Sequence, residues 1–160
     1  MTIRRVVTGL DEHGREAFLT DTQLEEVPNV NTMLTSLWRT AGDLQIPPKV
    51  AVEDQFGFPE PGGAWIMSWT VPPHSVAGEE GGGTTQAGEL PTGGAHATES
   101  IDVNIVLEGS IVFQLGDGSE TVLARGDSIV VNGVMHTWRN PGDETARMLS
   151  VLFGAQRSNG

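Results

Sequence analysis

Three side chains that suit metal binding or proton transfer stand in the second half of the chain: His96, Asp102 and His136. Two imidazoles and one carboxylate form a donor set that holds non-haem Fe(II) with open positions for oxygen and substrate. The same donors accept Mn, Zn or Ni, and the residue types do not select among these metals. We therefore predict that these three residues are catalytic and hold one divalent metal ion.

Polar side chains follow the first histidine at a strand-like spacing. Successive side chains of a strand alternate between its two faces, so residues of even number share a face. Four such residues are polar: His96, Thr98, Asp102 and Asn104. Because the opposite face carries Val103, Ile105 and Leu107, the polar face is expected to line a cavity. We predict that Thr98 adds a hydroxyl to the metal site and that Thr98 and Asn104 contact the substrate.

A predicted hairpin fixes the second histidine. Asn132-Gly133 is the strongest two-residue hairpin signal, and His136 begins the return strand. Trp138 has the same parity as His136, so it is expected to line the cavity and to stack on a flat substrate. Arg39 is a candidate for binding a substrate carboxylate, with an exposed strand charge as the alternative.

Two readings without a metal remain open. An inward histidine can be satisfied by hydrogen bonds alone. A histidine and an aspartate can also form an acid–base pair, in which the carboxylate orients the imidazole and raises its pKa.

The elements that position these residues are strands. Apolar and β-branched runs separated by short turns predict strands at 3–8, 15–20, 32–40, 64–71, 100–107, 111–115, 121–124, 128–131, 136–139 and 146–153. Residues 21–31 are expected to form a loop or a short helical turn. Residues 77–95 hold seven of the 21 glycines and are expected to form a lid or a segment without structure of its own. Close, regular turns and the absence of a strand–helix alternation predict an all-β sandwich or closed barrel.

Two groups of residues resemble the paired motifs of the cupin superfamily. The first group is Gly94, His96, Asp102 and Gly109, and the second is Gly126, Gly133, His136 and Asn140. The chain departs from the family pattern in having Thr98 in place of a histidine and Asp102 in place of a glutamate. The resemblance implies a jelly-roll barrel, or double-stranded β-helix, over residues 64–154. Residues 1–63 would form an N-terminal β-hairpin and an irregular extension that pack on the barrel, and residues 155–160 a tail.

The resemblance also implies a function. Cupins typically bind one metal ion, and we expect an enzyme that acts on a small organic acid or on an aromatic, polyketide-like compound. Oxygenase, decarboxylase, dehydratase and isomerase chemistry all occur in the family. The alternatives are a non-catalytic barrel that binds a small ligand and a metal-free His/Asp isomerase. Many cupins are homodimers, and we expect a homodimer in which the N-terminal hairpin forms the contact.

Charge and composition limit the partners. The formal net charge is −12, which repels nucleic acid and anionic membranes. No apolar run reaches the roughly 20 residues of a membrane-spanning helix, and the first residues lack a secretory signal. The chain has no cysteine and therefore no thiolate ligand. We expect a cytoplasmic protein without nucleic acid or membrane partners.

Overall fold

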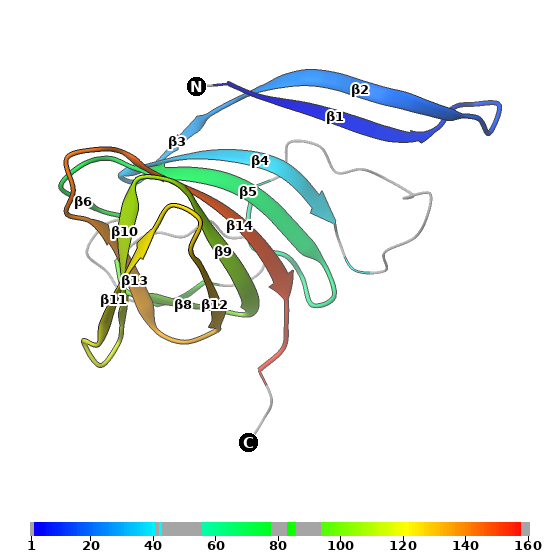
Figure 1. Ribbon diagram of the computed structural model, residues 1–160. Helices are drawn as coiled ribbons and strands as arrows, with labels where there is room; N and C mark the ends of the chain where they lie inside the picture. Colours follow the sequence, from blue (N-terminus) through cyan, green and yellow to red (C-terminus); the bar gives the residue numbers. More distant parts are fainter. Residues whose placement is uncertain (1, 41, 43–55, 78–82, 86–93, 158–160) are drawn as a thin grey trace.

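The computed structural model describes residues 2–40, 42, 56–77, 83–85 and 94–157, and it consists of two facing β-sheets and one separate hairpin (Figure 1). The larger sheet has the strand order β12 (Ser128–Asn132), β9 (Ser100–Glu108), β14 (Ala146–Gly154), β5 (Ala64–Val71), β4 (Thr32–Thr40) and β3 (Val27–Asn29). Every pair in it is antiparallel. None of the residues described belongs to a helix that is long and apolar enough to cross a membrane.

The smaller sheet closes the other side of the barrel. Its strand order is β11 (Glu120–Ala124), β10 (Ser110–Leu115), β13 (His136–Asn140), β8 (His96–Thr98) and β7 (Gly83–Thr85), and β6 (Ser75–Val76) pairs with β13 as well. Strands β7 and β8 are parallel, and the other pairs are antiparallel. Alternating side chains from both sheets meet in a common core, where Trp69 of β5 packs edge-on against Trp138 of β13 with ring centroids 5.6 Å apart.

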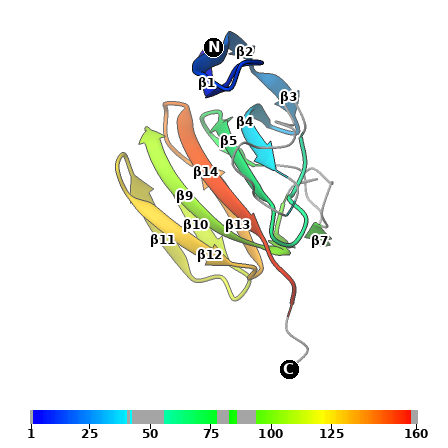
Figure 2. The same ribbon diagram turned by 90° about the vertical axis from the view of Figure 1, so that its right-hand side faces the viewer.

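The N-terminal hairpin stands apart from the barrel. Its strands β1 (Thr2–Leu10) and β2 (Glu16–Glu25) pair only with each other in the described part of the chain. Figure 2 shows it beside one edge of the large sheet, while the outer face of β5, β14 and β9 lies open.

The predicted all-β architecture and hairpin extension are confirmed. The hairpin predicted at Asn132-Gly133 was wrong, because β12 pairs with β9 in the large sheet whereas β13 pairs with β10 and β8 in the small sheet. Two other expectations were wrong in part. Residues 21–31 continue β2 as far as Glu25 and then form β3, with no helical turn. Residues 83–85 form a strand, whereas the rest of the predicted lid, at 78–82 and 86–93, lies outside the described residues. The boundary predicted at residue 64 separates the N-terminal extension from the barrel. In the structure β4, on one side of this boundary, pairs with β5, on the other side, along most of its length, so both belong to the large sheet.

Candidate functional site

A cavity lies between the two sheets, and most of its wall is apolar or aromatic. Its volume is about 60 Å³, which is room for a few waters. Its lining residues come from both sheets and from the chain segments beside them: Asn29, Thr32, Leu34, Phe58, Met67, Trp69, Ala77, His96, Asp102, Asn104, His136, Trp138, Ser150 and Leu152. The few polar groups in this wall are therefore the ones available to orient a ligand.

Two of these polar groups are the predicted histidines. His96 on β8 and His136 on β13 lie directly opposite each other in the sheet register. Their ring centroids are 4.5 Å apart, and the ring of Phe113 stacks on His136 with centroids 5.2 Å apart. Two imidazoles from separate parts of the chain thus share one end of the cavity wall.

The same local arrangement orients both imidazoles. The Nδ1 atom of His96 lies 3.1 Å from the carbonyl oxygen of Gly94, and the Nδ1 atom of His136 lies 2.9 Å from that of Val134. A carbonyl oxygen only accepts hydrogen bonds, so each Nδ1 carries the proton and donates it. Each Nε2 therefore keeps its lone pair for a metal ion or a proton.

Glycines make the turns that precede these histidines. Gly94 and Gly133 have φ angles of 62° and 60°, which is the left-handed region that side chains with a Cβ adopt only with strain. At Gly133 a Cβ would also lie 2.9 Å from the carbonyl oxygen of Thr98. The turn thus brings the chain close enough to β8 to place His136 beside His96.

Burial keeps both histidines neutral. Desolvation lowers the pKa of His96 below its ordinary value, against a smaller opposite effect of its bond to Gly94. Desolvation, together with the nearby His96, lowers the pKa of His136 to about 4. At neutral pH both rings are therefore uncharged, which is the form that binds metals and accepts protons.

Asp102 is buried in the same cavity wall, but on the large sheet. Desolvation raises its pKa to about 6, and the hydroxyls of Ser100 and Thr98 offset part of this rise. Its Oδ2 accepts a hydrogen bond of 3.4 Å from the Thr98 hydroxyl, whereas its Oδ1 is buried with no hydrogen-bond partner. A buried carboxylate oxygen without a partner is unusual and marks a position where an ion or a ligand would be stabilised.

The three predicted metal ligands do not form one tight group in this structure. Among the described residues, no three His, Asp or Glu side chains lie close enough together to share an ion. The chain passes from the small sheet to the large one between β8 and β9, so Asp102 lies in a different wall from the two histidines. Ligation by all three residues stays a prediction.

Two other predicted site residues lie outside the cavity wall. Thr98 is fully buried, and its hydroxyl is used by Asp102. Arg39 lies beyond a β-bulge between Ser36 and Trp38, and its buried guanidinium donates to the carbonyl oxygens of Gly57 and Phe58 at 3.1 and 3.2 Å. In this structure the Thr98 hydroxyl contacts Asp102, and Arg39 bonds to the segment before β5, so neither lines the cavity, and their predicted contacts with metal or substrate stay predictions.

Three side chains in the cavity wall form a hydrogen-bond network. Asn104 was predicted for the site, whereas Ser150 and Trp69 were not. The indole Nε1 of Trp69 donates to the hydroxyl of Ser150 at 2.7 Å, and this hydroxyl donates to Oδ1 of Asn104. Since the Asn104 oxygen is occupied, its NH₂ group is what it offers to the cavity. The polar Ser150 between the inward residues Met148 and Leu152 was the available signal. Trp138 lies in the wall as expected, and its contact with a substrate stays a prediction.

Comparison with known proteins identifies relatives of part of the chain. Residues 84–152 match the Cupin domain family. The phomopsin biosynthesis cluster protein D of Diaporthe leptostromiformis is 42% identical over 62 residues, which are 38% of this chain and 33% of that protein. The cupin-domain-containing oxidoreductase srdB of Neurospora crassa is 40% identical over 59 residues, 36% of this chain and 30% of that protein. The alignments therefore span only about a third of the length of these curated relatives.

The fold agrees with the family match. The cupin domain of Cnp3 from Schizosaccharomyces pombe superposes with a TM-score of 0.57, covers 94% of this chain and 87% of its own, and is 10% identical. An identity this low shows a shared fold and no more. The two histidine turns and the barrel agree with this match, and residues 84–152 form a domain that is similar to the Cupin domain family.

Proposed function

We propose that this protein is a metal-dependent enzyme that acts on a small organic molecule inside the cupin barrel. The observation that carries this proposal is the pair of neutral imidazoles, His96 and His136, whose Nδ1 atoms are held by carbonyl oxygens and whose Nε2 lone pairs are left free. The curated relatives support it, because their names assign them to biosynthesis clusters or to an oxidoreductase.

The residues present fit a divalent cation by their donor chemistry. His96 and His136 would bind through Nε2. Asp102 lies in the opposite wall, and its unpartnered Oδ1 would become a third ligand only if the two walls came closer together on binding. Carbonyl groups that hold the far nitrogen of each ring are typical supports for metal-bound histidines. When bound, Fe, Mn, Zn or Ni would polarise a substrate oxygen or, in the case of iron, activate dioxygen.

The wall of the cavity suggests the kind of substrate. Trp69 and Trp138 offer aromatic surfaces for a flat or apolar body, and the Asn104 amide offers a donor to a carbonyl or carboxylate oxygen. A small organic acid or an aromatic, polyketide-like compound has this combination of groups. The cavity of about 60 Å³ suits the small acid, and an aromatic compound would need the walls to move apart. Oxygenase, decarboxylase, dehydratase or isomerase chemistry would suit such a substrate.

The two alternatives to a metal enzyme, a metal-free His/Asp isomerase and a non-catalytic ligand-binding barrel, have different support in the geometry. In the predicted His/Asp acid–base pair, a carboxylate would orient an imidazole and raise its pKa. Here both Nδ1 atoms are bound to carbonyl oxygens, Asp102 is bound to Thr98, and both histidine pKa values are lowered. A non-catalytic ligand-binding barrel is the second candidate, since the described residues assemble no three-ligand group around an ion.

Metal analysis of protein purified without chelators tests the proposal. We expect about one divalent metal per chain, and metal titration of the stripped protein should give one site that His136→Ala abolishes. His74→Ala is the matched control, because His74 is exposed and pairs with Asp143 outside the cavity. A folded wild-type protein that neither retains nor takes up any of the four metals would overturn the enzyme proposal and leave the ligand-binding barrel.

A further inference from the structure

We infer that Ser150 and Trp69 determine which ligands the cavity accepts, because they fix the side-chain amide of Asn104 as a hydrogen-bond donor. A bound molecule places an acceptor oxygen, from a carbonyl or carboxylate group, against this amide on the large sheet. The inference rests on the proposed function in one respect, that a small molecule binds inside the barrel, and it needs no metal ion.

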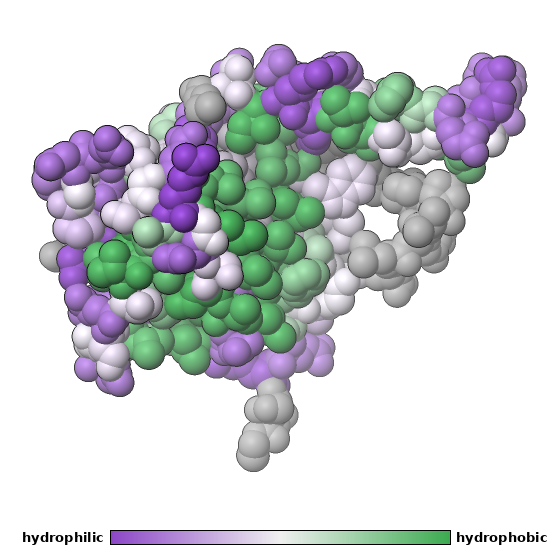
Figure 3. Space-filling view, viewed as in Figure 1, coloured by the Kyte–Doolittle hydropathy of each residue, from purple (hydrophilic) through white to green (hydrophobic). Residues whose placement is uncertain are grey.

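A row of polar side chains crosses the inner face of the large sheet. Trp69 lies on β5, Ser150 on β14 and Asn104 on β9, and β14 lies between the other two strands. Ser150 is directly opposite Asn104 in the register, and Trp69, which pairs with Met148, is diagonal to Ser150. Figure 3 shows hydrophobic residues over the outer face of these strands, so the polar row is on the side where apolar residues are the rule.

Burial makes the hydrogen bonds of this row costly to lose. Ser150 is 1% exposed, Asn104 5% and Trp69 6%. A buried donor or acceptor without a partner loses the hydrogen bonds that it made to water. The arrangement in which each of these groups is paired is therefore strongly preferred over its alternatives.

The row has a fixed direction, because the indole N–H of Trp69 can only donate. The Ser150 oxygen accepts this proton, and the hydroxyl gives its own proton to Oδ1 of Asn104. If the Asn104 amide turned over, its NH₂ group would face the hydroxyl, and the hydroxyl proton would be buried without an acceptor among the described residues. The amide is therefore held with its oxygen towards Ser150 and its NH₂ group towards the cavity.

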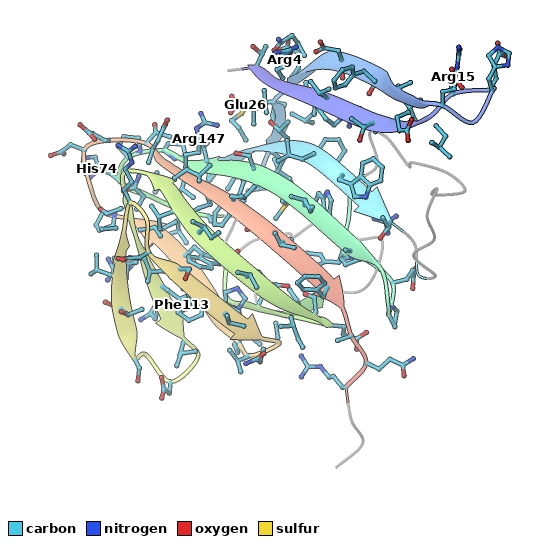
Figure 4. All side chains as sticks on the ribbon, turned by 45° about the vertical axis from the view of Figure 1, so that its right-hand side comes forward. Arg4, Arg15, Glu26, His74, Phe113 and Arg147 are labelled. Atoms are coloured by element: carbon cyan, nitrogen blue, oxygen red, sulfur yellow. The ribbon has the colours of Figure 1, made fainter. Side chains whose placement is uncertain are left out.

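The tryptophan that begins the row is held by the opposite wall. Trp69 packs edge-on against Trp138, whose ring also lies against Phe113 with centroids 4.8 Å apart. Figure 4 labels Phe113 in the small sheet, and the edge of Trp138 contacts His136 at 5.9 Å between centroids. The donor that orients the row is thus packed into the same aromatic cluster as one of the two cavity histidines.

The donor at Asn104 faces a cavity whose titratable groups offer lone pairs. His96 and His136 present Nε2 from the small sheet, and Asp102, on the same face of β9 as Asn104, leaves Oδ1 without a partner. No described residue accepts from the Asn104 NH₂ group. A ligand oxygen would pair with it, whereas a ligand N–H would meet a second donor and leave both unpaired. The end of the ligand that lies against β9 is therefore an acceptor.

Ligand titration of the full chain in the presence of a chelator, followed by NMR at the Trp138 indole, tests the inference. Acetone and acetamidinium are planar and share one heavy-atom shape, but acetone only accepts hydrogen bonds and acetamidinium only donates them. We expect the wild type to bind acetone. In Ser150→Ala the amide is free to turn its oxygen to the cavity, so the ratio of the two dissociation constants should move at least about tenfold in favour of acetamidinium. Asn104→Leu removes the donor and should weaken acetone binding about tenfold or more.

Ser36→Ala is the matched control. The Ser36 hydroxyl accepts a hydrogen bond of 2.9 Å from the indole of Trp65, and both residues lie in the large sheet but outside the cavity wall. This variant therefore also takes a serine partner from a buried tryptophan, and its ratio of dissociation constants should equal that of the wild type. Circular dichroism at the titration temperature checks that each variant is folded.

Three results would overturn the inference. The first is an unchanged ratio in folded Ser150→Ala, or an equal change in Ser36→Ala. The second is undiminished acetone binding by Asn104→Leu, which decides the matter if Ser150→Ala does not fold. The third is a wild-type cavity that takes up neither probe. Since the chelator removes metal from every sample, these results are separate from a failure of the protein to bind a metal ion.

Discussion

His96 and His136 lie directly opposite each other on β8 and β13, with ring centroids 4.5 Å apart and each Nδ1 held by the carbonyl oxygen of the residue two positions earlier. This relationship places two free Nε2 atoms in one buried cavity.

The stability of the metal-free protein should fall on acidification because of His136. Its pKa is about 4 in the folded chain and ordinarily 6.5, so the unfolded chain binds more protons between these values. The contribution of neutral His136 to the free energy of unfolding is therefore fully present above pH 6.5 and is lost as the pH falls towards 4. Denaturant unfolding should show the free energy of unfolding of the wild type, relative to His136→Gln, falling by roughly 3 kcal/mol over this range. A pH-independent difference between the two proteins would contradict the burial of His136.

Asp102→Asn should have opposite effects on stability and on metal binding. The pKa of Asp102 is about 6 in the folded chain and ordinarily 3.8, so its charged form destabilises the metal-free protein increasingly as pH rises from 3.8 to 6. At pH 8 the metal-free Asp102→Asn variant should therefore melt at a higher temperature than the wild type. The variant should also bind the metal at least tenfold more weakly if the free Oδ1 is a ligand. Unchanged metal affinity would exclude Asp102 from the metal site.

Ser150→Ala should destabilise the barrel through two groups that lose their partner. The Trp69 indole and the Asn104 oxygen both bond to the Ser150 hydroxyl. Leaving them buried and unpaired should cost about 2–4 kcal/mol in the free energy of unfolding. In a Trp69→Phe background the cost of Ser150→Ala should be smaller, because the unpaired donor is already gone. Equal costs in both backgrounds would show that the hydrogen bond from Trp69 to Ser150 does not contribute to stability.

Gly133→Ala should weaken both stability and metal binding, because this turn places His136. Its φ of 60° strains any residue with a Cβ, and the added carbon would lie 2.9 Å from the carbonyl oxygen of Thr98. We expect a loss of about 2 kcal/mol or more by denaturant unfolding. Gly118→Ala is the control: its φ of 88° carries the same strain, but no atom lies within 4 Å of the new Cβ, so only about 1 kcal/mol should be lost. Equal losses would mean that contact with Thr98 is unimportant.

The sequence by itself determined the local elements. Apolar alternation and turn residues predicted the strands at 32–40 and 64–71 with the bounds that the structure shows. The hairpin predicted at Asn132-Gly133 was wrong, because the chain changes sheets at this turn and β12 and β13 pair with other strands. The resemblance to the cupin motifs implied the barrel and marked His96 and His136 as candidates. The strands themselves depend on neighbouring residues, whose backbone geometry and side-chain alternation are fixed locally.

Only the tertiary structure decided which distant side chains meet. The passage from the small to the large sheet between β8 and β9 places Asp102 and the histidines in different walls, although parity along one strand would have put them together. The bulge in β4 and the carbonyl oxygens of Gly57 and Phe58 remove Arg39 from the cavity, and the pairing of β14 with β9 joins Ser150 to Asn104. Such relationships arise from strand pairing and packing between segments far apart in the chain, which no local pattern of residues encodes.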